Sequence, residues 1–278
     1  MNTAPPTRTE PTTRFLARPE GRIAYDAQGD GPLVICAPGM GDLRSSYRFL
    51  APALAEQGYR VATMDLRGHG DSDSDFSAYD DVAAGTDLIA LARELGGPAV
   101  LVGNSMSAGA AVWAAAEAPG LVSGLVLIGP FVRHVPVGRM AELALRVGLM
   151  RPWGPAAWNA YYGKLYPGRP PADLEEHRAR IRKSLRRPRR WNAFIATTHS
   201  SHAPAEARLG EVHAPVLVVM GEHDPDFPDA SAEATLVADR LNGEVFMVPD
   251  AGHYPQAEFP EIVAPRVARF LDRVSADA

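Results

Sequence analysis

Residues Val100–Gly109, with the sequence VLVGNSMSAG, decide how this chain is expected to fold. An apolar run enters a short turn at Gly103–Ser107, and an alanine-rich helical pattern follows at once. A serine at the apex of such a strand-to-helix turn adopts a strained backbone that lifts its hydroxyl clear of the sheet. The N-terminus of the following helix favours negative charge at the same place. The stretch therefore predicts a strand–turn–helix unit with Ser105 as a candidate nucleophile.

Apolar runs of this kind alternate with helical patterns along the rest of the chain. The runs are Leu33–Ala37, Arg60–Met64, Ala99–Gly103, Leu121–Ile128, Pro215–Met220 and Glu244–Val248. Continuous runs of Val, Ile and Leu separated by helices are typical of a parallel sheet that is covered on both faces. Since crossovers between parallel strands are right-handed, the sequence predicts a doubly wound, mostly parallel α/β sheet.

The alternation stops between residues 131 and 209, where helical stretches and proline-rich turns carry many aromatic residues. These aromatics are Trp153, Trp158, Tyr161, Tyr162, Tyr166, Trp191 and Phe194. We interpret the segment as a helical cap, or lid, over the carboxyl edge of the sheet, where ligands bind in open α/β sheets. The alternative is a structural subdomain whose aromatics form a core of their own. The expected organisation is a disordered tail (1–13), a core (14–130 and 210–278) and a cap (131–209).

Composition excludes several other classes of protein. The 278 residues carry a formal net charge of −5, which argues against a general affinity for nucleic acid or an anionic membrane. The apolar stretches are too short to span a bilayer, and the N-terminus lacks the apolar region of a signal peptide, so we expect a cytoplasmic protein. The single cysteine, Cys36, lies within an apolar run and is expected to be an inert core residue.

His253 and Asp224 each follow a late apolar run directly. His253 lies in the segment PDAGHYP after the last run, and Asp224 lies in GEHDP after the preceding one. Because the carboxyl ends of parallel strands meet at one edge, both side chains are expected near Ser105. A serine needs a base with a pKa near 7, and a carboxylate orients the imidazole and stabilises its cation. The order Ser105, Asp224, His253 therefore predicts a catalytic triad.

The segment APGMGD, residues 37–42, follows an earlier apolar run and is expected to form the oxyanion hole. Its glycines permit a backbone that turns an N–H inward. We predict that the N–H groups of Met40 and Met106 stabilise the oxyanion, with Gly41 as the alternative to Met40.

Other acidic and basic side chains lie near the predicted triad in the sequence. Asp226, Asp229 and Glu222 are rival acids, and Asp224 is preferred by its position. His223 is expected to lie at the surface beside the loop.

With these motifs in place, the chain resembles the α/β-hydrolase superfamily from about Phe15 to Val274. The segment MDLRGHGDS, residues 64–72, also matches the D-x-R-G-x-G-x-S turn of that superfamily. The resemblance implies Ser105 as nucleophile, Asp224 as acid and His253 as base, and a structural role for Asp65 and His69. Two positions depart from the family pattern. Ser107 replaces the second glycine of the G-x-S-x-G motif, and Pro38 replaces the usual histidine of the oxyanion loop.

The sequence supports three functional hypotheses. The first is a serine hydrolase that cleaves a carboxylic ester, lactone or thioester with an apolar or aromatic acyl group, through an acyl-enzyme intermediate. The second is a carbon–carbon bond hydrolase, or a cofactor-free haloperoxidase or perhydrolase, on the same triad. The third is a small-molecule-binding signalling protein on a hydrolase scaffold. No cofactor is implied, and the oligomeric state is not readable from the sequence.

Two further clusters are given structural interpretations. His199 and His202 have the spacing of metal ligands, but no neighbouring carboxylate or cysteine completes a site in the sequence. Arg178–Arg190 is rich in basic residues, and Asp173, Glu175 and Glu176 precede it, as the helix dipole favours. We interpret this basic cluster as a solvated helix, and the alternative is an electrostatic guide for an anionic substrate such as an acyl-CoA.

Overall fold

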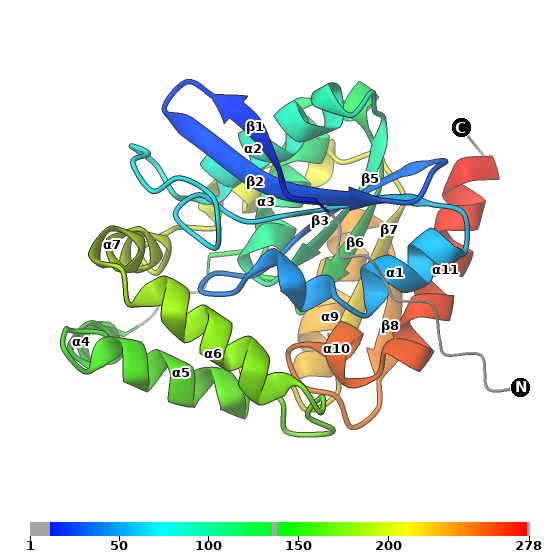
Figure 1. Ribbon diagram of the computed structural model, residues 1–278. Helices are drawn as coiled ribbons and strands as arrows, with labels where there is room; N and C mark the ends of the chain where they lie inside the picture. Colours follow the sequence, from blue (N-terminus) through cyan, green and yellow to red (C-terminus); the bar gives the residue numbers. More distant parts are fainter. Residues whose placement is uncertain (1–11, 135–137, 277–278) are drawn as a thin grey trace, which may run out of the picture.

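The computed structural model describes residues 12–134 and 138–276, and its strands form one eight-stranded sheet in the order β1-β2-β4-β3-β5-β6-β7-β8 (Figure 1). The strands are β1 (Arg14–Arg18), β2 (Gly21–Gln28), β3 (Leu33–Ala37), β4 (Arg60–Met64), β5 (Ala99–Asn104), β6 (Val122–Ile128), β7 (Val216–Gly221) and β8 (Glu244–Val248). Only β2 runs antiparallel to its neighbours, β1 and β4, and the other pairs are parallel. The predicted α/β fold is confirmed, and each predicted apolar run forms a strand.

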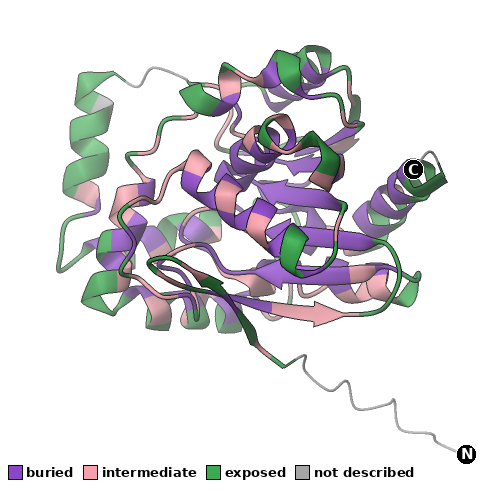
Figure 2. Ribbon diagram, turned by 90° about the horizontal axis from the view of Figure 1, so that it is seen from above, coloured by how far each residue is buried: buried purple, intermediate pink, exposed green. Residues whose placement is uncertain are grey.

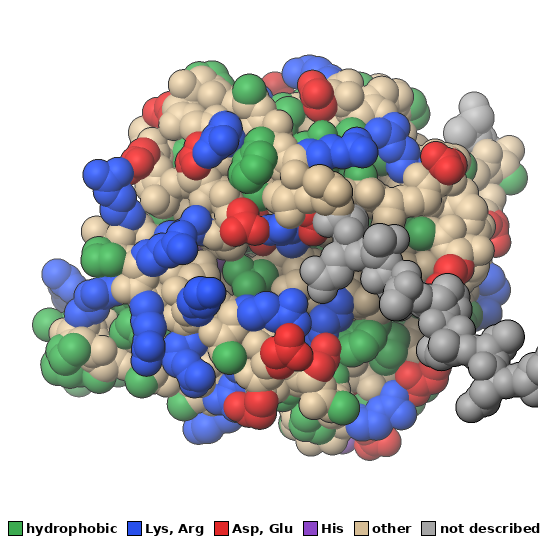
Figure 3. All heavy atoms as spheres, viewed as in Figure 1, with side chains coloured by type: hydrophobic (Ala, Val, Ile, Leu, Met, Phe, Trp, Pro, Cys, Tyr) green, Lys and Arg blue, Asp and Glu red, His purple; other side chains and the backbone are tan. Residues whose placement is uncertain are grey.

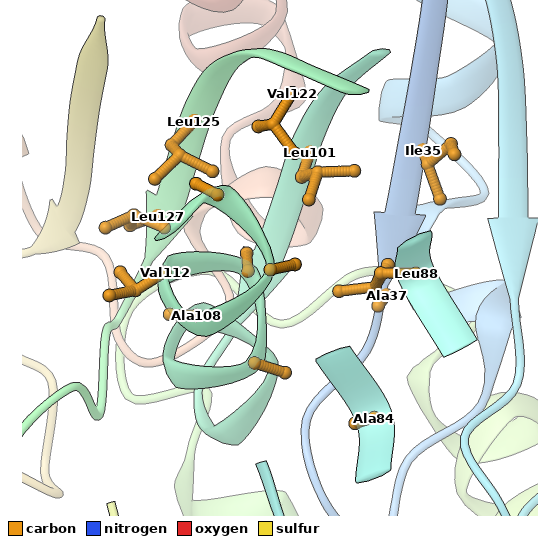
Figure 4. Close-up of a cluster of buried hydrophobic side chains, with 14 of the residues drawn as sticks. Ile35, Ala37, Ala84, Leu88, Leu101, Ala108, Val112, Val122, Leu125 and Leu127 are labelled. Atoms are coloured by element: carbon orange, nitrogen blue, oxygen red, sulfur yellow. The ribbon is translucent and has the colours of Figure 1, made fainter. Parts of the chain in front are cut away.

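Helices cover both faces of the sheet and bury a separate core on each. They are α1 (Leu50–Glu56), α2 (Asp81–Glu94), α3 (Met106–Glu117), α9 (Ala230–Leu241) and α11 (Pro260–Ala276). Alternate residues of each central strand point to opposite faces, so Leu101 faces the core of α2, α3 and α9, whereas Val100 faces that of α1 and α11. Figure 4 shows Leu101 and Leu125 of the sheet beside Ala108 of α3. Cys36 is fully buried in the second core, as expected.

The segment between β6 and β7 contains helices and, within its described residues, no strand. They are α4 (Arg139–Gly148), α5 (Gly154–Lys164), α6 (Leu174–Leu185), α7 (Pro188–Thr197) and α8 (Ala203–Glu206). We call residues 131–209 the helical insertion. The stretch around α5 was expected to be turns, but Pro155 lies in the first turn of the helix, where its missing N–H costs nothing.

Most aromatic side chains of the helical insertion are buried in a third core. This core contains Trp158, Tyr162, Tyr166, Trp191 and Phe194. Tyr254 and Ala257, which lie just after β8 in the sequence, belong to the same core. Trp153 and Tyr161 are the exposed members of the predicted aromatic set. The five buried rings therefore pack in a core that the insertion shares with the segment after β8, so they do not form a core of the insertion alone.

Helix α4 differs from the other helices of the insertion because every side chain described from Arg139 to Val147 is exposed (Figure 2, left edge). Met140, Leu143 and Val147 share one side of it at helical spacing, and each is at least 48% exposed. Across both described ranges, no helix is long and apolar enough to cross a membrane. The predicted tail lies almost wholly outside the described residues, and Thr13 is bonded to Arg44.

Candidate active site

Ser105 lies at the turn between β5 and α3 with φ 56° and ψ −123°, a backbone conformation that is strained for a side chain other than glycine. Its N–H donates to the carbonyl oxygen of Ile128 at 2.9 Å, which fixes the turn to the end of β6. A Cβ at Gly103 would clash with the backbone carbonyl of Ser107, so the strand and helix approach this closely only with glycine there. Ser105 is 7% exposed.

His253 and Asp224 form a buried pair in the loops that follow β8 and β7. Nδ1 of His253 lies 2.7 Å from Oδ2 of Asp224. Gly129, next to Ile128, packs against this pair, since a Cβ there would lie 2.9 Å from Nδ1 of His253. The end of β6 therefore contacts both the Ser105 turn and the His253–Asp224 pair. Because Nδ1 faces Asp224, Nε2 is the ring nitrogen left to exchange a proton.

A second carboxylate lies beside the same ring. Oδ2 of Asp226 is 3.7 Å from Nδ1 of His253. Burial of the ring lowers the pKa of His253, but the charges of Asp224 and Asp226 outweigh burial and raise it to about 9.

The remaining rivals lie elsewhere. Asp229 caps the N-terminus of α9 by accepting from the N–H of Ala232. Glu222 is exposed, and His223 is an exposed side chain 3.7 Å from Asp250, as expected for a surface residue.

The loop after β3 contacts the turn of Ser105. Of the two N–H groups predicted as alternative oxyanion donors in this loop, one has an acceptor in the protein and the other has none. A Cβ at Gly39 would lie 2.9 Å from Cβ of Ser105, so the two backbones are in close contact. The N–H of Gly41 donates to Nε2 of His69 at 2.9 Å. The N–H of Met40 has no acceptor among the residues described here. Of the two, Met40 is therefore the one whose N–H is available to an oxyanion.

His69 acts on this loop in a defined tautomer. Since Nε2 accepts from Gly41, the ring proton lies on Nδ1, which donates to the carbonyl of Arg67 at 2.8 Å. Burial lowers the pKa of His69 to about 4, so the ring is neutral at pH 7 and keeps its lone pair for Gly41. His69 therefore has the structural role that the resemblance implies, because it bonds the loop after β3 through Gly41.

The two departures from the family pattern contact each other. The hydroxyl of Ser107 donates to the carbonyl oxygen of Pro38 at 2.5 Å, and Ser107 is fully buried. The serine that replaces a glycine therefore joins the start of α3 to the loop in which a proline replaces a histidine.

Asn104, the last residue of β5, was not singled out from the sequence. Its side-chain N–H₂ donates to the carbonyl of Ile128 at 3.1 Å and to the carbonyl of His253 at 3.2 Å. Asn104 thus fastens the loop of His253 to the strand that carries Ser105. A polar side chain at the end of a buried strand was the signal that could have found it.

Helix α5 was also missed, and it and the residue after it contact the loops that follow β3, β7 and β8. Trp158 donates its indole N–H to the carbonyl of Gly41, and the hydroxyl of Tyr162 lies 3.0 Å from Oδ2 of Asp42. The hydroxyl of Tyr161 donates to Asp226. Just beyond the helix, the carbonyl of Leu165 accepts from the backbone N–H of His253. The helical insertion is therefore bonded to the loops that follow β3, β7 and β8.

The side chains that could ligate a metal lie in two places, beside the predicted triad and at His199 and His202. Among the residues described, Asp224, Asp226 and His253 are the one group of three metal-type ligands, and these same residues form the hydrogen-bonded pair and its neighbour. His202 binds Asp81 at 2.8 Å, a carboxylate that the sequence did not place beside it. His199 instead contacts the carbonyl of Ile195. The two histidines therefore engage different partners.

The sequence profile of the alpha/beta hydrolase family matches residues 34–266. The chain is 31% identical over 264 residues to 2-(acetamidomethylene)succinate hydrolase from Mesorhizobium japonicum, covering 91% of this chain and 93% of that one. A solved bacterial membrane phospholipase A is similar with a TM-score of 0.80 at 24% identity, over 95% of this chain and 87% of that one, which shows the fold alone. The putative non-heme bromoperoxidase BpoC of Mycobacterium tuberculosis H37Rv is 26% identical with a TM-score of 0.69, over 91% and 96%.

Proposed function

Since the chain belongs to the alpha/beta hydrolase family, we propose that it is a serine hydrolase that cleaves a carboxylic ester, lactone or thioester. The proposal rests on the contacts that the Ser105 turn and the His253–Asp224 pair both make at the end of β6. There a serine at positive φ contacts Ile128, the last residue of β6, and a buried His253–Asp224 pair contacts the next residue, Gly129. A serine, an imidazole and a carboxylate in this arrangement are the components of nucleophilic acyl transfer.

In the proposed reaction, Oγ of Ser105 attacks the acyl carbon while Nε2 of His253 takes its proton. Asp224 holds the ring through Nδ1 and stabilises the imidazolium. The N–H groups of Met40 and Met106 donate hydrogen bonds to the developing oxyanion, where one such donor is typically worth about 10²–10³ in rate. The imidazolium returns its proton to the leaving alcohol or thiol. Water then attacks the acyl-enzyme by the same route and releases the acid.

The test is hydrolysis of p-nitrophenyl esters of increasing chain length by the full chain and by Ser105→Ala. We expect the variant to lose about 10⁴–10⁶-fold in kcat. Ser231→Ala is the matched control, because Ser231 is an exposed serine of α9. A fluorophosphonate probe is expected to label the parent and Ser231→Ala, but not Ser105→Ala. Equal labelling or equal activity of Ser105→Ala would falsify the assignment.

A second candidate is a carbon–carbon bond hydrolase or a cofactor-free haloperoxidase or perhydrolase on the same triad. The similarity to 2-(acetamidomethylene)succinate hydrolase and to the putative non-heme bromoperoxidase supports this second candidate. Mass spectrometry of products from vinylogous diketones, and peroxide-dependent bromination of monochlorodimedone, distinguish it from an esterase. Tight binding of a small molecule without labelling of Ser105 would instead favour the signalling protein.

A further inference from the structure

A cleft of about 570 Å³ lies between α6 and the segment that follows the oxyanion loop. Its lining does not include Ser105, Asp224 or His253. One wall is formed by Arg180, Lys183, Ser184 and Arg187, whose spacing of three, four and seven places them on one side of α6 and its continuation. Figure 3 shows Lys and Arg side chains gathered over the area of α6 and α7.

The opposite wall carries two more arginines, and both are already paired. Arg44, in the 3₁₀ turn Arg44–Tyr47, binds a set of three carboxylates. These are Asp26, Asp65 and Asp71. Arg48 binds Asp173 through two nitrogens at 2.6 Å each. These pairs hold both arginines in place, and their four carboxylates neutralise the positive charge of this wall.

The cations on α6, by contrast, lack such partners. Arg180 has only an exposed contact with Glu176, at 3.5 Å. Lys183 and Arg187 pair with no carboxylate in the two described ranges. The buried hydroxyl of Ser184, between them, likewise has no hydrogen-bond partner among described groups. The α6 wall therefore presents positive charge to the cleft, and of its three cations only Arg180 has a carboxylate contact.

The charges lining the cleft do not balance. Its five basic residues, two on the arginine wall and three on α6 and its continuation, share the lining with three carboxylates, all of which bind Arg44. Since Asp173 also pairs with Arg48, the unpaired positive charge lies on the α6 side. The chain as a whole carries a net charge of −5, so this local excess is not a general property of the surface. Like charges gathered on one wall repel each other, and an anion bound beside Arg180, Lys183 and Arg187 reduces that repulsion.

We propose that this cleft binds a small organic ligand through one or more of its phosphate groups. Phosphate oxygens match the several separate cations, because Arg and Lys both bind phosphate through charge-assisted hydrogen bonds. Leu43, Ala51 and Pro52 supply an apolar part of the lining. The volume lies in the usual range of small-molecule sites, roughly 300–1,000 Å³. The ligand class is therefore a phosphorylated metabolite with an apolar or ring-bearing part, such as a nucleoside bisphosphate.

The experiment titrates the full chain calorimetrically with inorganic pyrophosphate and with adenosine 3′,5′-bisphosphate. The double variant Lys183→Ala/Arg187→Ala is expected to weaken binding by about 10–100-fold, since two charge-assisted bonds are lost. Arg182→Ala is the matched control, because Arg182 is an exposed arginine of the same helix outside the cleft. The control should bind as the parent does. Circular dichroism checks that each variant folds. If the double variant does not fold, the single variant Lys183→Gln is tested in its place.

Three outcomes overturn the proposal. The first is an absence of binding by the folded parent at millimolar ligand. The second is an equal loss in Arg182→Ala, which would mean that the attraction comes from diffuse charge. The third is binding to vesicles containing phosphatidylglycerol without binding of either soluble phosphate. That result would assign the α6 cations to a lipid-facing surface together with the exposed apolar side of α4. None of these readouts depends on hydrolytic activity.

Discussion

Asp226 places a second carboxylate beside the ring of His253, at 3.7 Å from Nδ1, while Asp224 holds the same nitrogen at 2.7 Å. Both charges favour the imidazolium and raise the pKa of His253 to about 9 against the opposing effect of burial. Since the proposed base acts only when neutral, kcat/KM should rise with pH over the range in which His253 loses its proton.

We predict that Asp226→Asn moves this rising limb of kcat/KM to lower pH by about 1 unit, because one charge that favours the imidazolium is gone. The measurement is the pH dependence of ester hydrolysis between pH 5 and 10. Asp229→Asn is the control, since asparagine caps a helix as well as aspartate does, and its profile should coincide with the parent's. An unmoved limb in Asp226→Asn would show that Asp226 does not act on the ring.

Ser107 allows a second prediction at a single position. Ser107→Ala removes the bond to the carbonyl of Pro38 and leaves that buried oxygen without its donor, at an expected cost of about 1–3 kcal/mol in the free energy of unfolding. Ser46→Ala is the matched control, since Ser46 is equally buried but its hydroxyl has no partner among the described residues. Urea denaturation should separate the two variants, and an equal stability would contradict the prediction.

The sequence predicts candidate site residues where the signal lies within a short stretch of chain. Ser105 lies in a strand–turn–helix unit that is legible from residues 100–109, and Asp224 and His253 directly follow apolar runs. The contacts of Asn104 with His253 and of Tyr161 with Asp226 join residues that are far apart in the sequence. They depend on how the loops pack, which no local spacing encodes. For the same reason the sequence alone leaves Met40 and Gly41 as alternatives, since the bond from the N–H of Gly41 to His69 also joins distant residues.

Among the elements, β1, β2 and α5 were not predicted. The β1–β2 pair lies at the edge of the sheet and includes exposed residues such as Phe15 and Arg22, so it lacks the continuous apolar pattern of the inner strands. In α5, Gly154 and Pro155 have the composition of a turn, although both are tolerated where the helix begins. The packing of Trp158 and Tyr162 in the third core stabilises α5, and helix propensity alone does not predict such packing.

Helix α5 meets the oxyanion loop through a buried polar cluster. The hydroxyl of Tyr162 contacts Oδ2 of Asp42 and the hydroxyl of Tyr166, each at 3.0 Å, and Nε2 of His177 lies 2.8 Å from Oδ1 of Asp42. Asp42 is fully buried, so each donor to it matters.

We predict that Tyr162→Phe lowers the free energy of unfolding by about 1–3 kcal/mol, because Oδ2 of Asp42 loses a donor inside the protein. Thermal or urea unfolding measures this directly. Tyr25→Phe is the control, since Tyr25 is a buried tyrosine of β2 whose hydroxyl has no hydrogen-bond partner among the described residues. If both variants unfold at the same urea concentration, the cluster does not stabilise the junction between α5 and the loop.

For the whole molecule, two histidines with opposite shifts govern how stability depends on pH near neutrality. Burial lowers the pKa of His69 to about 4. Burial also lowers that of His253, but Asp224 and Asp226 raise it to about 9. In the unfolded chain both titrate near 6.5. Below pH 6.5 the unfolded chain binds a proton at His69 that the folded chain refuses, so stability falls as the pH drops toward 4. Above pH 6.5 the folded chain keeps a proton on His253 that the unfolded chain releases, so stability falls as the pH rises through 9.

We therefore predict a maximum in the free energy of unfolding near pH 6.5, and urea denaturation between pH 5 and 9 measures it. The shift of His69 corresponds to roughly 3 kcal/mol lost by pH 4, and part of this loss should appear by pH 5. His69→Asn removes the titrating group and should flatten the acid side alone, whereas His253→Asn should flatten the alkaline side alone. Each variant is thus the control for the other. A stability that stays level from pH 6.5 to 9 would mean that His253 is neutral in the folded protein, and the ring would then be ready to act as a base without first losing a proton.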